Sequence, residues 1–142
     1  MDFELLYPSK YLKAADLGDR EVTKTIGAVK LEDLEGVDGT KKQKVIVTFK
    51  DAKKQWVMPR TCGEALRLMF GKETNAWTGK RVTLYSRKVD SFGEEVDAVR
   101  VKGSPDIKAA IKEVVPRGRK KIIVDVIVTK GDAASPEPGS AG

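Results

Sequence analysis

The chain has 142 residues, with 27 Lys and Arg against 21 Asp and Glu, which gives a net charge of +6, and it contains no histidine and one cysteine. Without an imidazole it cannot build a Ser/His/Asp or Cys/His relay, and the common nitrogen ligand of zinc, copper and non-haem iron is missing. The lone Cys62 cannot form an internal disulfide, which indicates an intracellular protein. These counts favour a binding protein over an enzyme, with no metal or cofactor.

Length and hydropathy favour one soluble domain. No apolar run approaches the ~20 residues of a membrane span. The acidic start Met1-Asp2-Phe3-Glu4 also lacks the basic region of a signal peptide. We expect a cytoplasmic protein with one domain over residues 1–130. The stretch 131–142 is rich in Gly, Ala, Ser and Pro without periodicity, which predicts a disordered tail.

The first expected strand covers residues 20–31, which are rich in Val, Thr and Ile, with a bulge or bend at Gly27. The acidic stretch 32–40 contains Gly36 and Asp38-Gly39 and predicts a loop or wide turn. Apolar and polar residues then alternate at a period of two, which predicts a hairpin of two further strands. These strands cover residues 45–50 and 54–58.

The next element has helical spacing. Thr61 and Glu64 are placed as a capping box, apolar residues follow at helical intervals up to Phe70, and Gly71 is placed to end the helix. Trp77, just beyond, is expected to fill the core.

Strands are expected again at 81–87 and 96–102, separated by a turn at 90–93. Residues 107–115 fit a helix or a strand. The clear strand at 122–128 favours a final hairpin.

This order gives five strands, with a helix between the third and the fourth, followed by a hairpin. It predicts an all-β protein with one short helix, built as a five-stranded OB-fold-like Greek-key barrel plus a C-terminal β-hairpin extension. An SH3-like barrel or a small sandwich fits the same order. In an OB-fold the second and third strands form the usual binding face.

The positive charge is concentrated at that face. Between Lys41 and Arg60 there are seven basic residues and one acid, Asp51, which leaves 20 basic and 20 acidic residues in the rest of the chain. A basic segment on a neutral body is typical of proteins that bind nucleic acids. The alternative is a lysine-rich hairpin that is only solvated.

Single-stranded nucleic acid is held by basic grooves and by aromatic side chains on which bases stack. Trp56 is the best stacking candidate, although it fits the core equally well. Tyr85 lies between basic neighbours in its strand. Arg119, Lys120 and Lys121 fit phosphate contacts or a solvated turn equally well. The expected nucleic-acid-binding residues are Lys41, Lys42, Lys44, Lys54, Trp56, Arg60, Arg81, Tyr85, Arg87, Lys88, Phe92 and Arg100.

Two other features of the sequence could carry chemistry, an acidic cluster and the lone cysteine. The carboxylates Glu32, Asp33, Glu35 and Asp38 do not have the spacing of an EF-hand, and a solvated acidic turn is the simpler interpretation. Cys62 lies in the first turn of the expected helix, where the helix dipole would lower its pKa, but it has no base or partner thiol. We expect Cys62 to be chemically passive.

The stretch from Trp56 to Lys102 contains Trp-Val-Met-Pro-Arg-Thr, Trp77-Thr-Gly-Lys-Arg-Val-Thr-Leu-Tyr85, Phe92-Gly93 and Val99-Arg100-Val101, followed by Gly103-Ser-Pro-Asp106. It resembles a family of small bacteriophage and prophage proteins. The resemblance implies an OB-fold, a link to phage DNA replication or recombination, and a place in the host cytoplasm. Many strand-binding proteins end in an acidic tail that recruits partners, whereas the last twelve residues here hold only Asp132 and Glu137, so we do not expect such a tail.

The sequence therefore predicts a single-stranded-DNA-binding protein with little sequence preference, with phage or host replication and recombination proteins as further partners. One alternative is a basic interaction module that acts as a phage adaptor or as an inhibitor of a host protein. A subunit of a nuclease or recombinase is the other. An edge strand at 122–128 would allow homo-oligomers.

Overall fold

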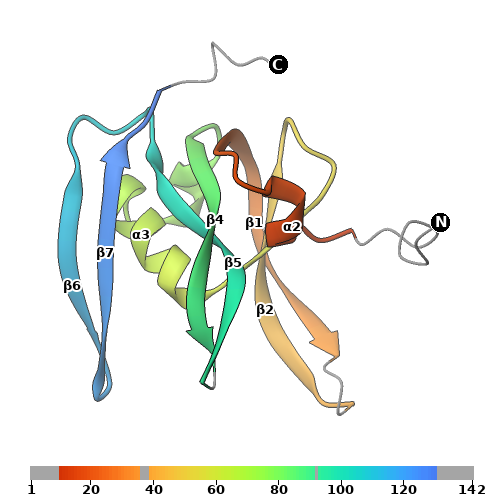
Figure 1. Cartoon of the computed structure of the whole chain (residues 1–142). Coiled ribbons are helices and arrows are strands. Elements are labelled where there is room, and N and C mark those ends of the chain that lie inside the picture. Colours follow the sequence, from red (N-terminus) through yellow and green to blue (C-terminus); the bar gives the residue numbers. More distant parts are fainter. Residues whose placement is uncertain (1–9, 36–38, 92, 131–142) are drawn as a thin grey trace.

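The computed structural model describes residues 10–35, 39–91 and 93–130 (Figure 1). Strands dominate this part of the chain, and one helix is longer than a single turn, so the expectation of an all-β protein with one short helix is confirmed. The strands are β1 (Val22–Glu35), β2 (Lys41–Phe49), β3 (Trp56–Met58), β4 (Arg81–Ser91), β5 (Glu94–Ser104), β6 (Ile111–Arg117) and β7 (Lys120–Val128). The helices are α2 (Ala14–Leu17), α3 (Arg60–Phe70) and the 3-10 helix η1 (Thr74–Trp77).

Strand β1 changes its pairing partner along its length. Its first residues pair with β4, with Thr25 opposite Arg81, and from Ile26 onward it pairs with β2. The register shifts between Ile26 and Ala28, so the bulge predicted at Gly27 is confirmed. Because Gly27 has no Cβ, the β2 backbone can approach closely: a Cβ there would lie 3.3 Å from the Thr48 carbonyl oxygen. This bend joins two antiparallel units, β1-β2-β3 and β4-β5.

The predicted closed barrel of five strands is wrong. Seven strands form one open sheet in the order β3-β2-β1-β4-β5-β7-β6. No ladder joins β3 to β5 within the described residues, although that pairing would close the first five strands into a barrel. Only three residues of β3 are extended, and the chain enters α3 at Arg60, so β3 is too short to continue along β5.

The C-terminal hairpin is confirmed. Residues 111–117 form a strand, which settles the ambiguous stretch in favour of β structure from Ile111 onward. The expected edge strand at 122–128 is wrong, because β7 lies between β5 and β6 and the two edges of the sheet are β3 and β6.

Helix α3 crosses one side of the sheet and contacts β5, β6 and β7 (Figure 1). It ends at Gly71 as predicted, but the predicted capping box is wrong. The N-cap is Pro59, two residues before Thr61, and the Glu64 carboxylate accepts hydrogen bonds from Arg60 and Arg67.

The buried apolar side chains of both halves of the sheet form one core. Trp77 is part of it, as expected, and its indole N–H donates to the Gly71 carbonyl at 2.7 Å. Among the described residues, no helix has the length and apolar character needed to cross a membrane.

The hairpin joins the sheet through a short parallel contact, in which Gly103 and Ser104 of β5 pair with Ile127 and Val128. A Cβ at Gly103 would overlap the backbone of Ile127. Only glycine therefore allows β7 to approach β5 this closely.

Replacing Gly103 by Ala should lower the free energy of unfolding by at least ~2 kcal/mol, because the backbones of β5 and β7 must separate. Gly63→Ala is the matched control. Its Cβ would contact only the flexible end of Met58, and alanine favours the helix by ~1 kcal/mol. Urea unfolding measures both variants, and equal stability of Gly103→Ala and wild type would contradict the close contact.

Candidate nucleic-acid interface

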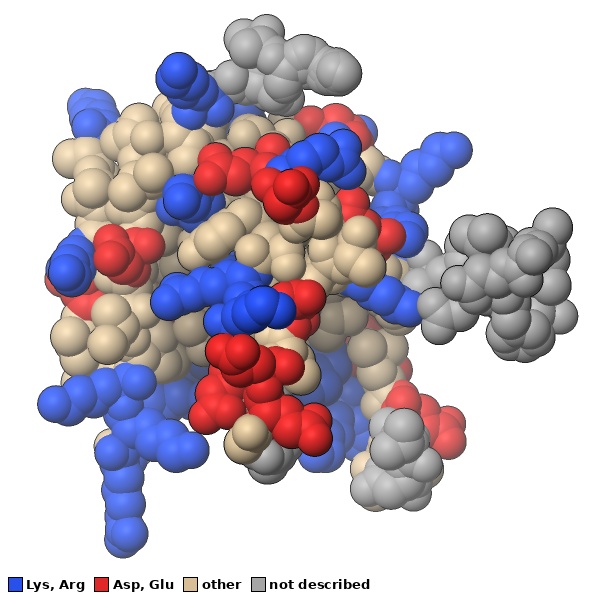
Figure 2. Space-filling model, viewed as in Figure 1, with Lys and Arg blue, Asp and Glu red and all other residues tan. Residues whose placement is uncertain are grey.

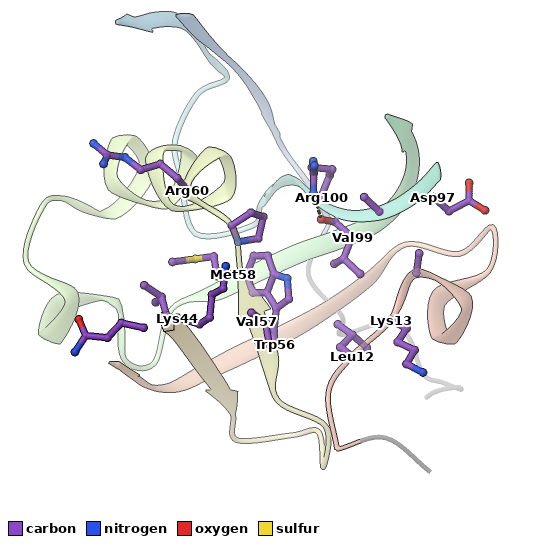
Figure 3. A pocket seen from close by; sticks show the side chains of 15 residues that line it. Leu12, Lys13, Lys44, Trp56, Val57, Met58, Arg60, Asp97, Val99 and Arg100 are labelled. Atoms are coloured by element: carbon purple, nitrogen blue, oxygen red, sulfur yellow. Dashed lines mark hydrogen bonds between the residues drawn. The ribbon is translucent and has the colours of Figure 1, made fainter. Parts of the chain in front are cut away.

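A groove lies where β3 and β5 face each other without pairing (Figure 3). Its volume is about 580 Å³. Strand β2 and the segment before α2 complete its walls, and the first residue of α3 lies at one end. The lining residues are Leu12, Lys13, Ala14, Gln43, Lys44, Val45, Trp56, Val57, Met58, Pro59, Arg60, Asp97, Ala98, Val99 and Arg100.

The charged side chains around this groove are mostly basic. Lys13, Lys44, Arg60 and Arg100 line it, against one acid, Asp97. They come from four separate parts of the chain, and Figure 3 shows Arg60 on α3 and Arg100 beside Val99 on β5. The cationic rim of this groove would attract a polyanion, and its apolar floor would contact apolar groups of the same ligand.

The two arginines of the rim, Arg60 and Arg100, form hydrogen bonds with neighbouring groups of the protein. Arg60 forms an ion pair with Glu64 at 3.2 Å, but 62% of its side chain stays exposed. The Arg100 guanidinium donates to the Val99 carbonyl at 2.9 Å, which fixes it at the edge of β5. The hydrogen bond from Arg67 lowers the pKa of Glu64 against the opposing effect of burial, and Arg60 lowers it further.

Trp56 belongs to the core. It is 1% exposed and stacks on Phe49, with ring centroids 6.3 Å apart and planes inclined by 16°. Of the two positions that the sequence leaves open for Trp56, the structure has the core position, in which little of the ring is open to a base. The indole instead forms part of the floor of the groove.

A second, smaller cavity of about 310 Å³ lies between β5 and β7 and is bounded by the first turns of α3. Tyr85, Arg87 and Arg100 line it, so Arg100 belongs to both hollows. Tyr85 is half-buried, and the Lys102 ammonium lies 5.0 Å from the centre of its ring. This places an aromatic ring among cations, as the sequence predicts, but outside the main groove.

Three of the expected binding residues do not line the groove and are held in ion pairs, one of them with Asp97, the acid at the rim. Lys54 pairs with Asp16 at 2.9 Å, Arg81 with Asp106 at 2.7 Å, and Lys88 with Asp97 at 3.3 Å. The hydrogen bond from Arg81 lowers the pKa of Asp106. Partial burial would raise the pKa of Asp16, but hydrogen bonds from Lys54 and the Lys13 backbone outweigh burial and lower it.

The remaining expected residues are scattered. Lys41 and Lys42 are exposed at the start of β2, beyond the groove, and Phe92 lies outside the described residues. Of the twelve expected residues, the structure brings four to the main groove: Lys44, Trp56, Arg60 and Arg100.

Residues 32–35 of the acidic stretch 32–40, for which the sequence predicts a loop or wide turn, are instead the end of β1, and residues 36–38 lie outside the described residues. Residues 32–35 continue the strand and pair with the basic start of β2, so Glu32 lies opposite Lys44 and Glu35 opposite Lys41. Opposite charges across a ladder are stabilising. The basic segment therefore has acidic neighbours, and Figure 2 shows acidic and basic side chains interspersed over much of the visible face.

Cys62 lies in the first turn of α3, where its Sγ contacts the Val99 carbonyl at 3.8 Å. Burial raises its pKa to about 11, against the opposing effects of Arg100 and the Val101 N–H. The expectation of a lowered pKa is wrong, because the loss of hydration outweighs the helix dipole. At neutral pH the side chain is a protonated thiol.

Lys13 was not predicted from the sequence. The backbone of residues 10–12 adds to the outer side of β3 through hydrogen bonds with Gln55, and this brings Lys13 to the groove. Residues 7–18 have no strand or helix periodicity that would signal such a contact.

Comparison of this chain with protein-family models, with curated proteins and with solved structures finds no match.

Trp56→Ala should lower the free energy of unfolding by ~3–5 kcal/mol, because it leaves a large cavity against Phe49. Tyr85→Ala is the comparison. Because the Tyr85 ring is only half-buried, its removal should lower the free energy of unfolding clearly less than Trp56→Ala does. Guanidinium unfolding measures both. A Trp56→Ala protein as stable as wild type would show that the indole lies outside the core.

Proposed function

We propose that this protein binds single-stranded DNA in the groove between β3 and β5, with little sequence preference. The observation that carries this proposal is the rim of the groove, where four cations face one acid around an apolar floor. Phosphates would contact the cationic ends of Lys13, Lys44, Arg60 and Arg100. The bases would lie over the apolar floor, which has no directed hydrogen-bonding pattern with which to select one base over another.

The strand order supports this proposal. The first five strands follow the order β3-β2-β1-β4-β5, and α3 connects the third to the fourth. This is the arrangement of an OB-fold without its closing pair, and OB-folds are often partly open and bind oligonucleotides on strands two and three. The groove uses that same face, since β2 and β3 supply Gln43, Lys44, Val45 and residues 56–58. The resemblance to phage proteins would place this binding in phage DNA replication or recombination.

A second candidate function follows from the unpaired strands. Within the described residues, 56–58 of β3 pair only with β2 and 97–100 of β5 pair only with β4. Such strand edges accept an extended peptide as an added strand. An acidic peptide would suit the same cations. In this second candidate function the protein is a basic interaction module that binds an acidic segment of a partner protein.

Binding to fluorescent oligothymidine should weaken as salt rises, since cations that contact phosphates release counterions from the strand. The variant Lys13→Gln/Lys44→Gln/Arg100→Gln should reduce the slope of log K against log salt by about 2, because each contact contributes ~0.7. Fluorescence anisotropy between low and moderate salt gives both slopes.

The matched control removes the same charge from exposed lysines outside the groove: Lys72→Gln/Lys80→Gln/Lys108→Gln. It should keep the wild-type slope. Equal losses in the two triple variants, affinity independent of salt, or no binding at micromolar protein would overturn DNA binding in the groove. If an acidic peptide then binds and the groove variant loses it, the second candidate replaces the first.

A further inference from the structure

The hairpin of β6 and β7 carries a dense group of unpaired positive charge at its turn. Arg117, Arg119, Lys120 and Lys121 are all exposed, and none of them has an ion pair with a described acidic side chain. The turn is tight, because Arg117 pairs with Lys120 across two residues and Gly118 takes a left-handed φ of 60°. Figure 2 shows basic side chains at the lower left, where this turn lies in Figure 1.

This arrangement costs stability in the free protein. Arg117 and Lys120 lie directly opposite each other, and like charges at such positions destabilise a hairpin. The neighbouring position adds Lys121 opposite Pro116, which again brings no acid to the turn. A bound polyanion would remove this repulsion, because one phosphate can interact with both side chains.

The hairpin also borders the second cavity. Ile123, Val124, Asp125 and Val126 of β7 form one wall of that cavity, and Tyr85, Arg87 and Arg100 lie on the other side. Arg100 lines the groove between β3 and β5 as well. Arg100, Arg87 and the half-buried Tyr85 ring therefore connect the main groove with the hairpin wall, where Asp125 is the one acid that lines the second cavity.

We propose that the β6–β7 hairpin is a second contact for the DNA backbone, and that it binds the phosphates of a strand that leaves the groove past Arg100. This inference rests on the proposed function. It adds a separate element, which lies beyond the five strands of the OB-like unit and acts on nucleotides outside the groove. Strands long enough to leave the groove therefore gain affinity from the hairpin, and short strands do not.

The test compares two oligothymidines, one of about 8 nucleotides, within the usual site size of one OB-fold, and one of about 24. The hairpin variant is Arg117→Gln/Arg119→Gln/Lys120→Gln/Lys121→Gln. Its control removes four exposed lysines elsewhere: Lys53→Gln/Lys72→Gln/Lys80→Gln/Lys108→Gln. For the long strand, the hairpin variant should lose about 2 to 3 from the salt slope, while its binding of the short strand and both slopes of the control stay unchanged.

A hairpin variant that binds the long strand like its control would overturn the hairpin contact alone. If the hairpin variant loses affinity for the long strand while the groove variant loses none, the hairpin contact stands and the groove proposal fails. No binding of either strand by wild type overturns both.

The thermal midpoint gives an independent readout. It should stay equal or rise in the hairpin variant, because the Arg117–Lys120 repulsion is gone, and a fall would contradict that repulsion. If the fourfold variant does not fold, the double variant Arg119→Gln/Lys121→Gln replaces it, because it keeps the cross-strand pair of Arg117 and Lys120. About half of the slope change is then expected, and none would overturn the contact.

Discussion

The change of partner within β1 is the constraint on which the rest of the structure depends. Strand β1 belongs to both halves of the sheet. Its first four paired residues pair with β4, and the remaining residues pair with β2. The chain can make this change because Gly27 lets the backbone of β2 come close at the bulge. As a result, the β1-β2-β3 unit turns relative to the β4-β5 unit, and the outer strands β3 and β5 come to face each other.

The groove is a direct consequence of incomplete closure. Strand β3 ends after three residues because the chain turns into α3 at Pro59, so the two outer strands stay apart. The Met58, Val99 and Trp56 side chains form the floor, and the polar ends of residues from four segments surround it. A fully closed barrel would have covered this apolar surface with a ladder, which leaves no space for a ligand.

Local patterns in the sequence predict most of the elements but few of the site residues. Alternation locates the strands, and apolar spacing locates α3 and its end at Gly71. Trp56 could not be assigned, because in a continuous strand Lys54 would share its face, whereas β3 begins only at Trp56. The acidic end of β1 resembles a turn until it is paired with the lysines of β2, and that contact lies outside the local pattern. Lys13 reaches the groove only through the contact of residues 10–12 with Gln55.

Folding brings acidic side chains next to many of the basic residues that are clustered in the sequence. Cross-strand acids accompany the lysines of β2, and ion pairs engage Lys54, Arg81 and Lys88. Exposed positive charge remains at the rim of the groove, where Arg60 also pairs with Glu64 and Lys44 lies opposite Glu32. It remains as well at the β6–β7 turn, whose four basic side chains have no ion pair with a described acidic side chain. Backbone amide chemical shifts, followed by NMR during titration with oligothymidine, test the groove most directly. Binding in the groove predicts that the largest shifts occur at Lys44, Met58, Val99 and Arg100, with none at Lys72 and Lys108. Shifts that leave these four residues unchanged would contradict it.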